Sequence, residues 1–154
     1  MAGLKDALRD DLTASMKARD ALRSSTLRMA LTAIAMAEVA GRQARELNDE
    51  QVLDVLISEA KKRREAASAY DEAGRTDRAD KERAESAILA QYLPEQLGAE
   101  EISAIVAQAI TDTGAAADGM KAMGKVMGAV QPQVKGRADG AAVAAEVRRQ
   151  LSAS

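Results

Sequence analysis

The sequence predicts an all-α protein made of two helical units, and three observations support that prediction. The chain of 154 residues has two tyrosines and no phenylalanine or tryptophan, so its core must come from aliphatic side chains and alanine. Apolar residues recur three and four positions apart through most of the chain, which is the spacing of one helix face. No stretch alternates polar residues with β-branched or aromatic ones, so no strand is predicted.

We expect a four-helix unit in residues 1–93. Leucines at 4, 8 and 12 mark one side of a first helix over about 4–18. Asp20 can cap a second helix. That helix is unusually apolar between Met29 and Ala37 and should lie centrally, and Gly41 ends it.

The third and fourth helices of this unit follow a linker. Asn48 is a good cap for the third helix, because acidic residues follow it at the positive end of the helix dipole. Gly74 ends that helix, and the fourth runs from Asp77 to about Tyr92. The first half of the fourth helix is highly charged, so we expect it to project into solvent.

A smaller three-helix unit is expected in residues 94–154. Pro94 disfavours helical geometry at the residue before it, so the segment from 92 to 98 is the joint between the units. The first helix here ends at Gly114. The second can be capped by Asp118 and ended or kinked by Pro132, and Asp139 can cap the last. The apolar faces of the second and last helices are expected to consist of Met120, Met123, Met127 and Val130, and of Val143, Val147 and Leu151.

Missing residue types limit the chemistry. Without cysteine or histidine the chain has no thiol nucleophile, no imidazole base and no histidine or thiolate metal site, and no cofactor is predicted. The carboxylates lie on charged helix faces beside basic residues, so none is expected in an apolar pocket. The net charge is −2, so any binding of nucleic acid must use a local patch.

No apolar run is long enough to cross a membrane and no signal peptide is evident, so a cytoplasmic protein is expected.

The candidate binding surface lies near the carboxyl end of the chain. Gly124 and Gly128 are one helical turn apart, and each glycine inside a helix costs about 1 kcal/mol relative to alanine. Close approach by another backbone would explain them. Packing against a second helix is favoured over contact with a ligand backbone, although both can hold. The flanking cations are Lys121, Lys125, Lys135 and Arg137.

Two other motifs have simpler interpretations. Residues 119–126 nearly match a phosphate-binding loop, but Val126 replaces the metal-binding hydroxyl and no strand precedes it. The basic run at 61–64 fans around a helix, and spacing of four residues pairs Glu59 with Arg63 and Lys61 with Glu65. That run is therefore expected to be a solvated, neutralised face.

Several segments together resemble the GatB/YqeY-domain proteins over almost the whole chain. They are residues 4–5, 16–20, 26–29, 61–63, 73–75, 92–97, 120–127 and 135–140. The resemblance implies an all-helical fold whose C-terminal unit is similar to the tail domain of the B subunit of glutamyl/aspartyl-tRNA amidotransferase. It also implies contact with tRNA, in support of a tRNA synthetase or amidotransferase. Ala99 and Gly119 depart from the family pattern, which usually has hydroxyl caps there.

Three functions remain open from the sequence. The first is a non-catalytic tRNA-binding accessory protein, with Lys121, Gly124, Lys125, Gly128, Lys135 and Arg137 as the nucleic-acid-binding residues. The second is a module that docks on a synthetase or amidotransferase without touching RNA. The third is glutamine-dependent amide transfer, which is least favoured because cysteine and histidine are absent.

Overall fold

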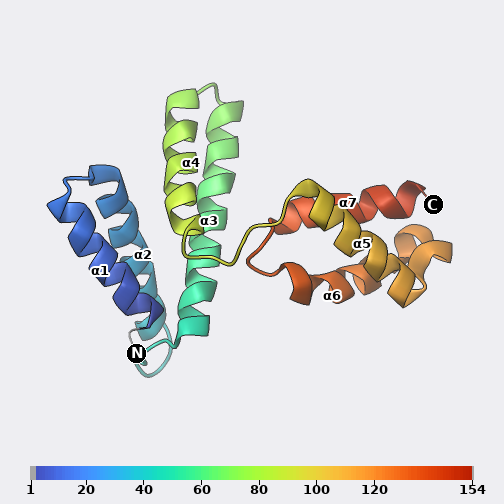
Figure 1. The fold of residues 1–154 in the computed structure, drawn as a ribbon, viewed down its shortest axis with the longest axis horizontal. Coiled ribbons are helices and arrows are strands. Elements are labelled where there is room, and N and C mark those ends of the chain that lie inside the picture. Colours follow the sequence, from blue (N-terminus) through green and yellow to red (C-terminus); the bar gives the residue numbers. More distant parts are fainter. Residues whose placement is uncertain (1–2, 154) are drawn as a thin grey trace. The chain divides into compact units, whose positions relative to one another are not determined.

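The computed structural model describes residues 3–153, and every regular element within that range is helical (Figure 1). The all-α fold predicted from the sequence is confirmed. The chain divides into two compact units, Met1–Leu93 (unit 1) and Pro94–Ser154 (unit 2). Each unit has its own cluster of buried aliphatic residues.

Unit 1 is built around its second helix. Its elements are α1 (Leu4–Lys17), α2 (Ala21–Val39), α3 (Asp49–Glu72) and α4 (Thr76–Ala90). The α2 helix contacts all three others, as does α3, so the predicted central place of α2 is shared with α3. The buried core consists mainly of Leu8, Leu27, Ala30, Ile34, Val52, Leu56, Ala60 and Leu89.

The helix ends in unit 1 follow the capping residues in the sequence. The Asp20 carboxylate accepts a hydrogen bond from the backbone N–H of Arg23 at 3.1 Å and starts α2. Asn48 and Gln51 cap each other's backbone N–H groups at the start of α3. The turn after α1 places Arg19 in the left-handed region at φ 59°, where a side chain is strained.

The charged residues in the first half of α4 are mostly exposed, as expected, but this half also packs against α3. In Figure 1, α3 and α4 lie side by side as a hairpin. Arg83 donates to Asp71 on α3 at 2.7 Å and to Asp80 on its own helix at 2.6 Å. Ala79 is fully buried between these charges. The small side chain of Ala79 is buried among exposed charged residues, and a count of charges along the segment does not predict this.

Tyr92 anchors the end of unit 1. Its hydroxyl donates to the Asp11 carboxylate on α1 and accepts from the Arg23 guanidinium on α2 at 3.2 Å. Arg23 also donates to the Gln91 side chain at 2.8 Å. Burial, together with the Asp11 carboxylate, raises the pKa of Tyr92 to about 12. The residues just before Pro94 are thus fixed to the first two helices.

Unit 2 packs three α-helices through a core rich in valine. Its elements are α5 (Ala99–Thr113), the short 3₁₀ turns η1 (Ala115–Ala117) and η2 (Gly119–Ala122), α6 (Met123–Val134) and α7 (Gly140–Ala153). Gly114 ends α5 in the left-handed region at φ 65°, as expected. Asp139 accepts from the Ala141 N–H at 3.3 Å at the start of α7. The inward residues of α7 are Val143, Val147 and Leu151, as predicted.

The second helix of unit 2 differs from the prediction in two ways. It begins at Met123 rather than after Asp118, whose side chain makes no capping bond. Its buried strip is Ala122, Val126, Val130 and Val134, while Met120 is 47% exposed. Both the methionine set and the alanine–valine set have helical spacing. Val130 belongs to both sets and is buried as predicted, Met123 and Met127 are half-buried against the core, and Met120 is the member of the predicted face that is exposed.

Pro132 neither ends nor breaks α6, which continues to Val134. A proline inside a helix removes the hydrogen bond to the carbonyl four residues earlier, here that of Gly128. Both residues are exposed, so water can satisfy that carbonyl. The loss of helix stability expected from Pro132 is therefore smaller, because the residue lies on the solvent side of α6. No helix among residues 3–153 is long and apolar enough to cross a lipid bilayer.

Candidate nucleic-acid interface

The exposed side of α6 carries the two glycines singled out in the sequence. Because Val126 and Val130 face the core, Gly124 and Gly128 lie on the opposite side and are exposed. A Cβ atom added to either glycine would meet no other atom within 4 Å. The favoured interpretation, that these glycines let another helix of the chain pack closely, is therefore wrong for residues 3–153.

The glycines instead leave a strip of helix backbone open to an outside partner. Pro132 continues the strip one turn beyond Gly128, and its missing N–H leaves the Gly128 carbonyl without its usual helical donor. Open backbone at these positions costs helix stability, since alanine would be better by about 0.5–1 kcal/mol at each glycine.

Two lysines stand at the amino end of this strip. Lys121 lies on η2 and Lys125 in the first turn of α6, and both are exposed. Within residues 3–153, neither makes an ion pair. The α6 helix also has no acidic residue in its first turn, so nothing there offsets the positive end of its dipole. Lysines and dipole together give this end of α6 a positive potential.

The other two cations lie at the carboxyl end of α6. Lys135 is exposed there, whereas Arg137 is half-buried and donates from Nε to the Glu95 carbonyl at 3.2 Å. Its Nη1 also reaches the Gln133 carbonyl at 3.5 Å. Part of the Arg137 guanidinium is thus used to hold the chain that enters unit 2.

Hydrogen bonds join the segments at 95–97 and 136–137. The Gln96 side chain donates to the Gly136 carbonyl at 2.8 Å, and the Leu97 N–H donates to the Arg137 carbonyl at 2.8 Å. Gly136 itself has a φ of 74°, which favours glycine. These two segments are among those that carried the family resemblance. Nothing in their spacing along the sequence reveals that they meet.

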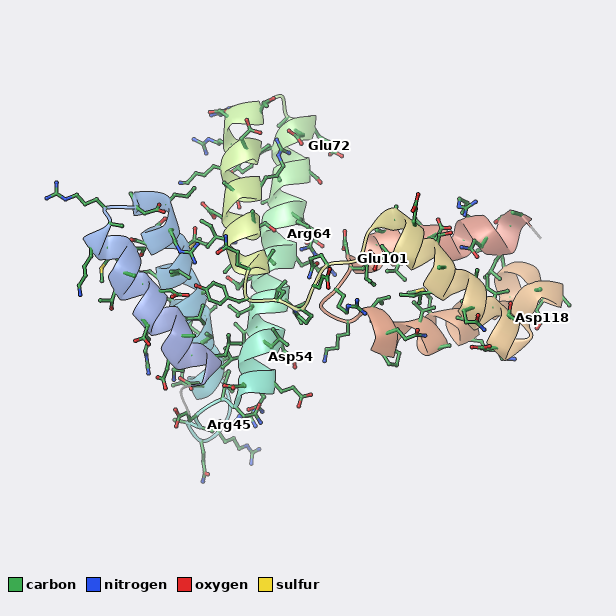
Figure 2. The ribbon with its side chains drawn as sticks, viewed as in Figure 1. Arg45, Asp54, Arg64, Glu72, Glu101 and Asp118 are labelled. Carbon is green, nitrogen blue, oxygen red and sulfur yellow. The ribbon has the colours of Figure 1, made fainter. Side chains whose placement is uncertain are left out.

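The candidate residues therefore form two groups along one helix. Figure 2 shows Glu101 and Asp118 at opposite ends of unit 2. Lys121 follows Asp118 closely, and the Lys135–Arg137 turn contacts the chain that leads to Glu101. At 1.5 Å per helical residue, about 15 Å separates Lys125 from Lys135. We call this set of six predicted residues, Lys121, Gly124, Lys125, Gly128, Lys135 and Arg137, the Lys/Gly face.

Buried carboxylates in unit 1 are a feature that the sequence analysis missed. Arg63 lies 3.3 Å from Glu85 and 3.5 Å from Glu59, and both glutamates are buried. Burial raises the pKa of Glu85, and the nearby Glu82 adds to the effect. The expectation that carboxylates stay on solvated faces is wrong here. The predicted pairs Glu59–Arg63 and Lys61–Glu65 are confirmed, the second at 3.9 Å.

This buried cluster has the character of a structural ion network. The Arg63 guanidinium on α3 lies between Glu59 of its own helix and Glu82 and Glu85 of α4, so it joins the two helices. Among the described residues, no three acidic side chains converge in a way that could hold a metal ion.

Comparison with known proteins gives two matches. The family model of Yqey-like proteins matches residues 5–151. An uncharacterized protein of Schizosaccharomyces pombe is 36% identical over 92 residues, which cover 60% of this chain and 73% of the yeast protein.

Proposed function

The chain belongs to the Yqey-like protein family, and on that premise we propose that it is a non-catalytic RNA-binding accessory protein with tRNA as its ligand. Residues 94–154 form the RNA-binding domain and residues 1–93 a separate helical domain. The protein works in the cytoplasm beside a tRNA synthetase or amidotransferase, which carries out the chemistry.

The observation that carries the proposal is the open glycine strip next to Lys121 and Lys125, which make no ion pair within residues 3–153. Added Cβ atoms at Gly124 and Gly128 would meet nothing within 4 Å, so the strip serves no packing purpose among the described residues. A phosphodiester backbone could approach such a strip closely. Lys121 and Lys125 lie where they could neutralise its phosphates.

The contacts of the two tyrosines favour recognition of RNA by its shape and phosphates over recognition by stacking on its bases. The Tyr92 hydroxyl is held by Asp11 and Arg23, and the Arg78 guanidinium lies 5.9 Å from the centre of the Tyr70 ring. Both tyrosines are therefore engaged within unit 1. Stacking on splayed bases is the usual route to sequence-specific RNA binding. We accordingly expect affinity for folded RNA with little preference for sequence.

Titration of labelled tRNA with the full chain tests the proposal. The Lys121→Glu/Lys125→Glu variant should weaken binding at least about tenfold, because it replaces two phosphate contacts with two repulsive charges. The matched control is Lys61→Glu/Arg148→Glu, which makes the same change in net charge at exposed positions on other helices, α3 and α7.

The comparison of the two variants decides the outcome. Equal loss of affinity in both variants would mean that only overall charge matters, and the Lys/Gly face would be rejected. Unchanged affinity in the Lys121→Glu/Lys125→Glu variant would reject it as well.

A further inference from the structure

The outer side of α2 is apolar but uncovered. Met36 is 66% exposed and Val39 is 65% exposed, although both lie in the helix at the centre of unit 1. In a soluble protein the side of a helix that faces away from the core is normally polar. The exposed side of α2 is therefore the side on which a partner is missing.

A groove of about 440 Å³ runs along this side, between α2 and α3. Its floor is made by α2, through Met29, Thr32, Ala33 and Met36. Its charged lining residues are Arg28, Glu59, Lys62 and Arg63. A groove with an apolar floor between two neighbouring helices is a typical binding site for a third helix. Methionine also suits such a floor, because its flexible side chain adapts to different partners.

The charges that face solvent around the groove are cationic. The Lys62 side chain is 64% exposed, whereas that of its partner Glu59 is only 11% exposed. Arg28 is exposed, donates to the Met16 sulfur at 3.0 Å and, among residues 3–153, pairs with no carboxylate. The acids of this region are Glu59, Glu82 and Glu85, which are at most 21% exposed and lie against Arg63, and Glu59 also pairs with Lys62 at 3.0 Å. An occupant must therefore bring acidic groups of its own.

Two other occupants fit the groove less well. A second copy docking through the same groove would bring the Arg28 and Lys62 of one chain toward those of the other, and Glu59, the acid among the lining residues, is 11% exposed and already paired with Lys62 of its own chain. RNA would find phosphate partners at the rim, but it would leave the apolar floor formed by Met29 and Met36 unused.

We propose that the groove between α2 and α3 binds an amphipathic helix of a partner protein, with apolar residues facing Met29 and Met36 and acidic residues facing Arg28 and Lys62. This surface belongs to unit 1 and is independent of the Lys/Gly face of unit 2. It equips the protein to hold a protein partner with one unit while the other remains available.

Selection from a phage-displayed library of 20-residue helical peptides, with the full chain as bait, tests the proposal. Excess Met36→Asp protein is added in solution as a competitor. It binds the peptides that recognise other surfaces, so the wild-type bait retains only peptides that depend on the groove. Met36 is exposed, so its replacement leaves the core of unit 1 intact. The recovered peptides should carry more Asp and Glu than Lys and Arg beside their apolar stripe. Their affinity should fall as salt is raised.

Individual peptides are then measured against variants of the bait. Met36→Asp and Arg28→Glu should each weaken binding at least about tenfold, as removal of a central contact does. Met120→Asp is the matched control, because it places the same charge at another exposed methionine, and it should leave binding unchanged.

Four results would overturn the proposal. They are a failure to recover peptides that depend on Met36, recovered peptides without an excess of acidic residues, binding that is insensitive to Arg28→Glu, and a groove occupied by something else. Sedimentation velocity and tRNA titration detect the last result. A dimer dispersed by Met36→Asp would assign the groove to a second copy, and loss of tRNA affinity in the same variant would assign it to RNA.

Discussion

Replacing both exposed glycines of α6 by alanine should stabilise the protein. An alanine methyl at Gly124 or Gly128 would meet no atom within 4 Å, and neither residue has a positive φ. Each substitution then brings only the gain in helix propensity, about 0.5–1 kcal/mol. The Gly124→Ala/Gly128→Ala variant should gain about 1–2 kcal/mol in the free energy of unfolding of unit 2.

Differential scanning calorimetry of the full chain measures this gain. For a domain of 60–100 residues, 1 kcal/mol corresponds to a shift in Tm of about 4–8 °C, so the transition of unit 2 should rise by roughly 4–16 °C. Gly114→Ala is the matched control. Gly114 also has open space around it, but its φ is 65°, so alanine there is strained and should lower Tm.

The sign of the change in Tm decides whether the two glycines are packing residues. A Tm that falls in the double variant would mean that the glycines are needed for packing, and the open strip would not exist. If the strip contacts RNA, the same variant should bind tRNA more weakly while it unfolds at a higher temperature. Two effects of opposite sign in one variant cannot be explained by misfolding.

Three further substitutions test the local chemistry. Tyr92→Phe should destabilise unit 1 by about 1–2 kcal/mol in urea denaturation, since it removes the hydroxyl shared by Asp11 and Arg23, and an unchanged midpoint would contradict that role. Arg19→Gly should raise the Tm of unit 1 slightly, because glycine accepts a φ of 59° without strain, and a lower Tm would show that the arginine side chain matters more. Hydrogen bonds from Arg149 and then Gln150 hold the pKa of Glu146 at about 2, below its usual 4.5, so its contribution to stability should be present above pH 4.5 and lost as the pH falls toward 2. Glu146→Gln should therefore lower stability at pH 7 but not at pH 2, and an equal loss at both pH values would count against this account.

The sequence predicted the parts of the fold that depend on local chemistry. Asp20 and Asn48 cap their helices because their short side chains reach the first free N–H groups, and this is visible in the order of residues alone. Gly114 ends α5 for an equally local reason. Such features need no knowledge of distant contacts.

What the sequence did not predict depends on contacts between distant residues. Val126 and Met120 both have helical spacing from Val130, and only the packing of unit 2 decides that Val126 is buried and Met120 exposed. The bond from Arg137 to the Glu95 carbonyl joins positions far apart in the chain, and no spacing rule indicates it. The burial of Glu85 follows from the hairpin of α3 and α4, since Arg63 is brought to it from the other helix.

The positions of the site residues were predicted, but their surroundings were not. The sequence favours a packing role for Gly124 and Gly128, because helix propensity alone does not show what approaches a glycine. Lys121 and Lys125 were expected beside them, and whether acids pair with them could not be judged from the sequence. The role of the Lys/Gly face in binding RNA stays a prediction.

The most direct test of that role is the salt dependence of tRNA binding. Each phosphate contact contributes about 0.7–0.9 to the slope of log K against log of the salt concentration. Removing two lysines by Lys121→Ala/Lys125→Ala should therefore reduce the slope by roughly 1.5 relative to the wild type. A slope that is the same in both proteins would show that these lysines touch no phosphate and would contradict the account.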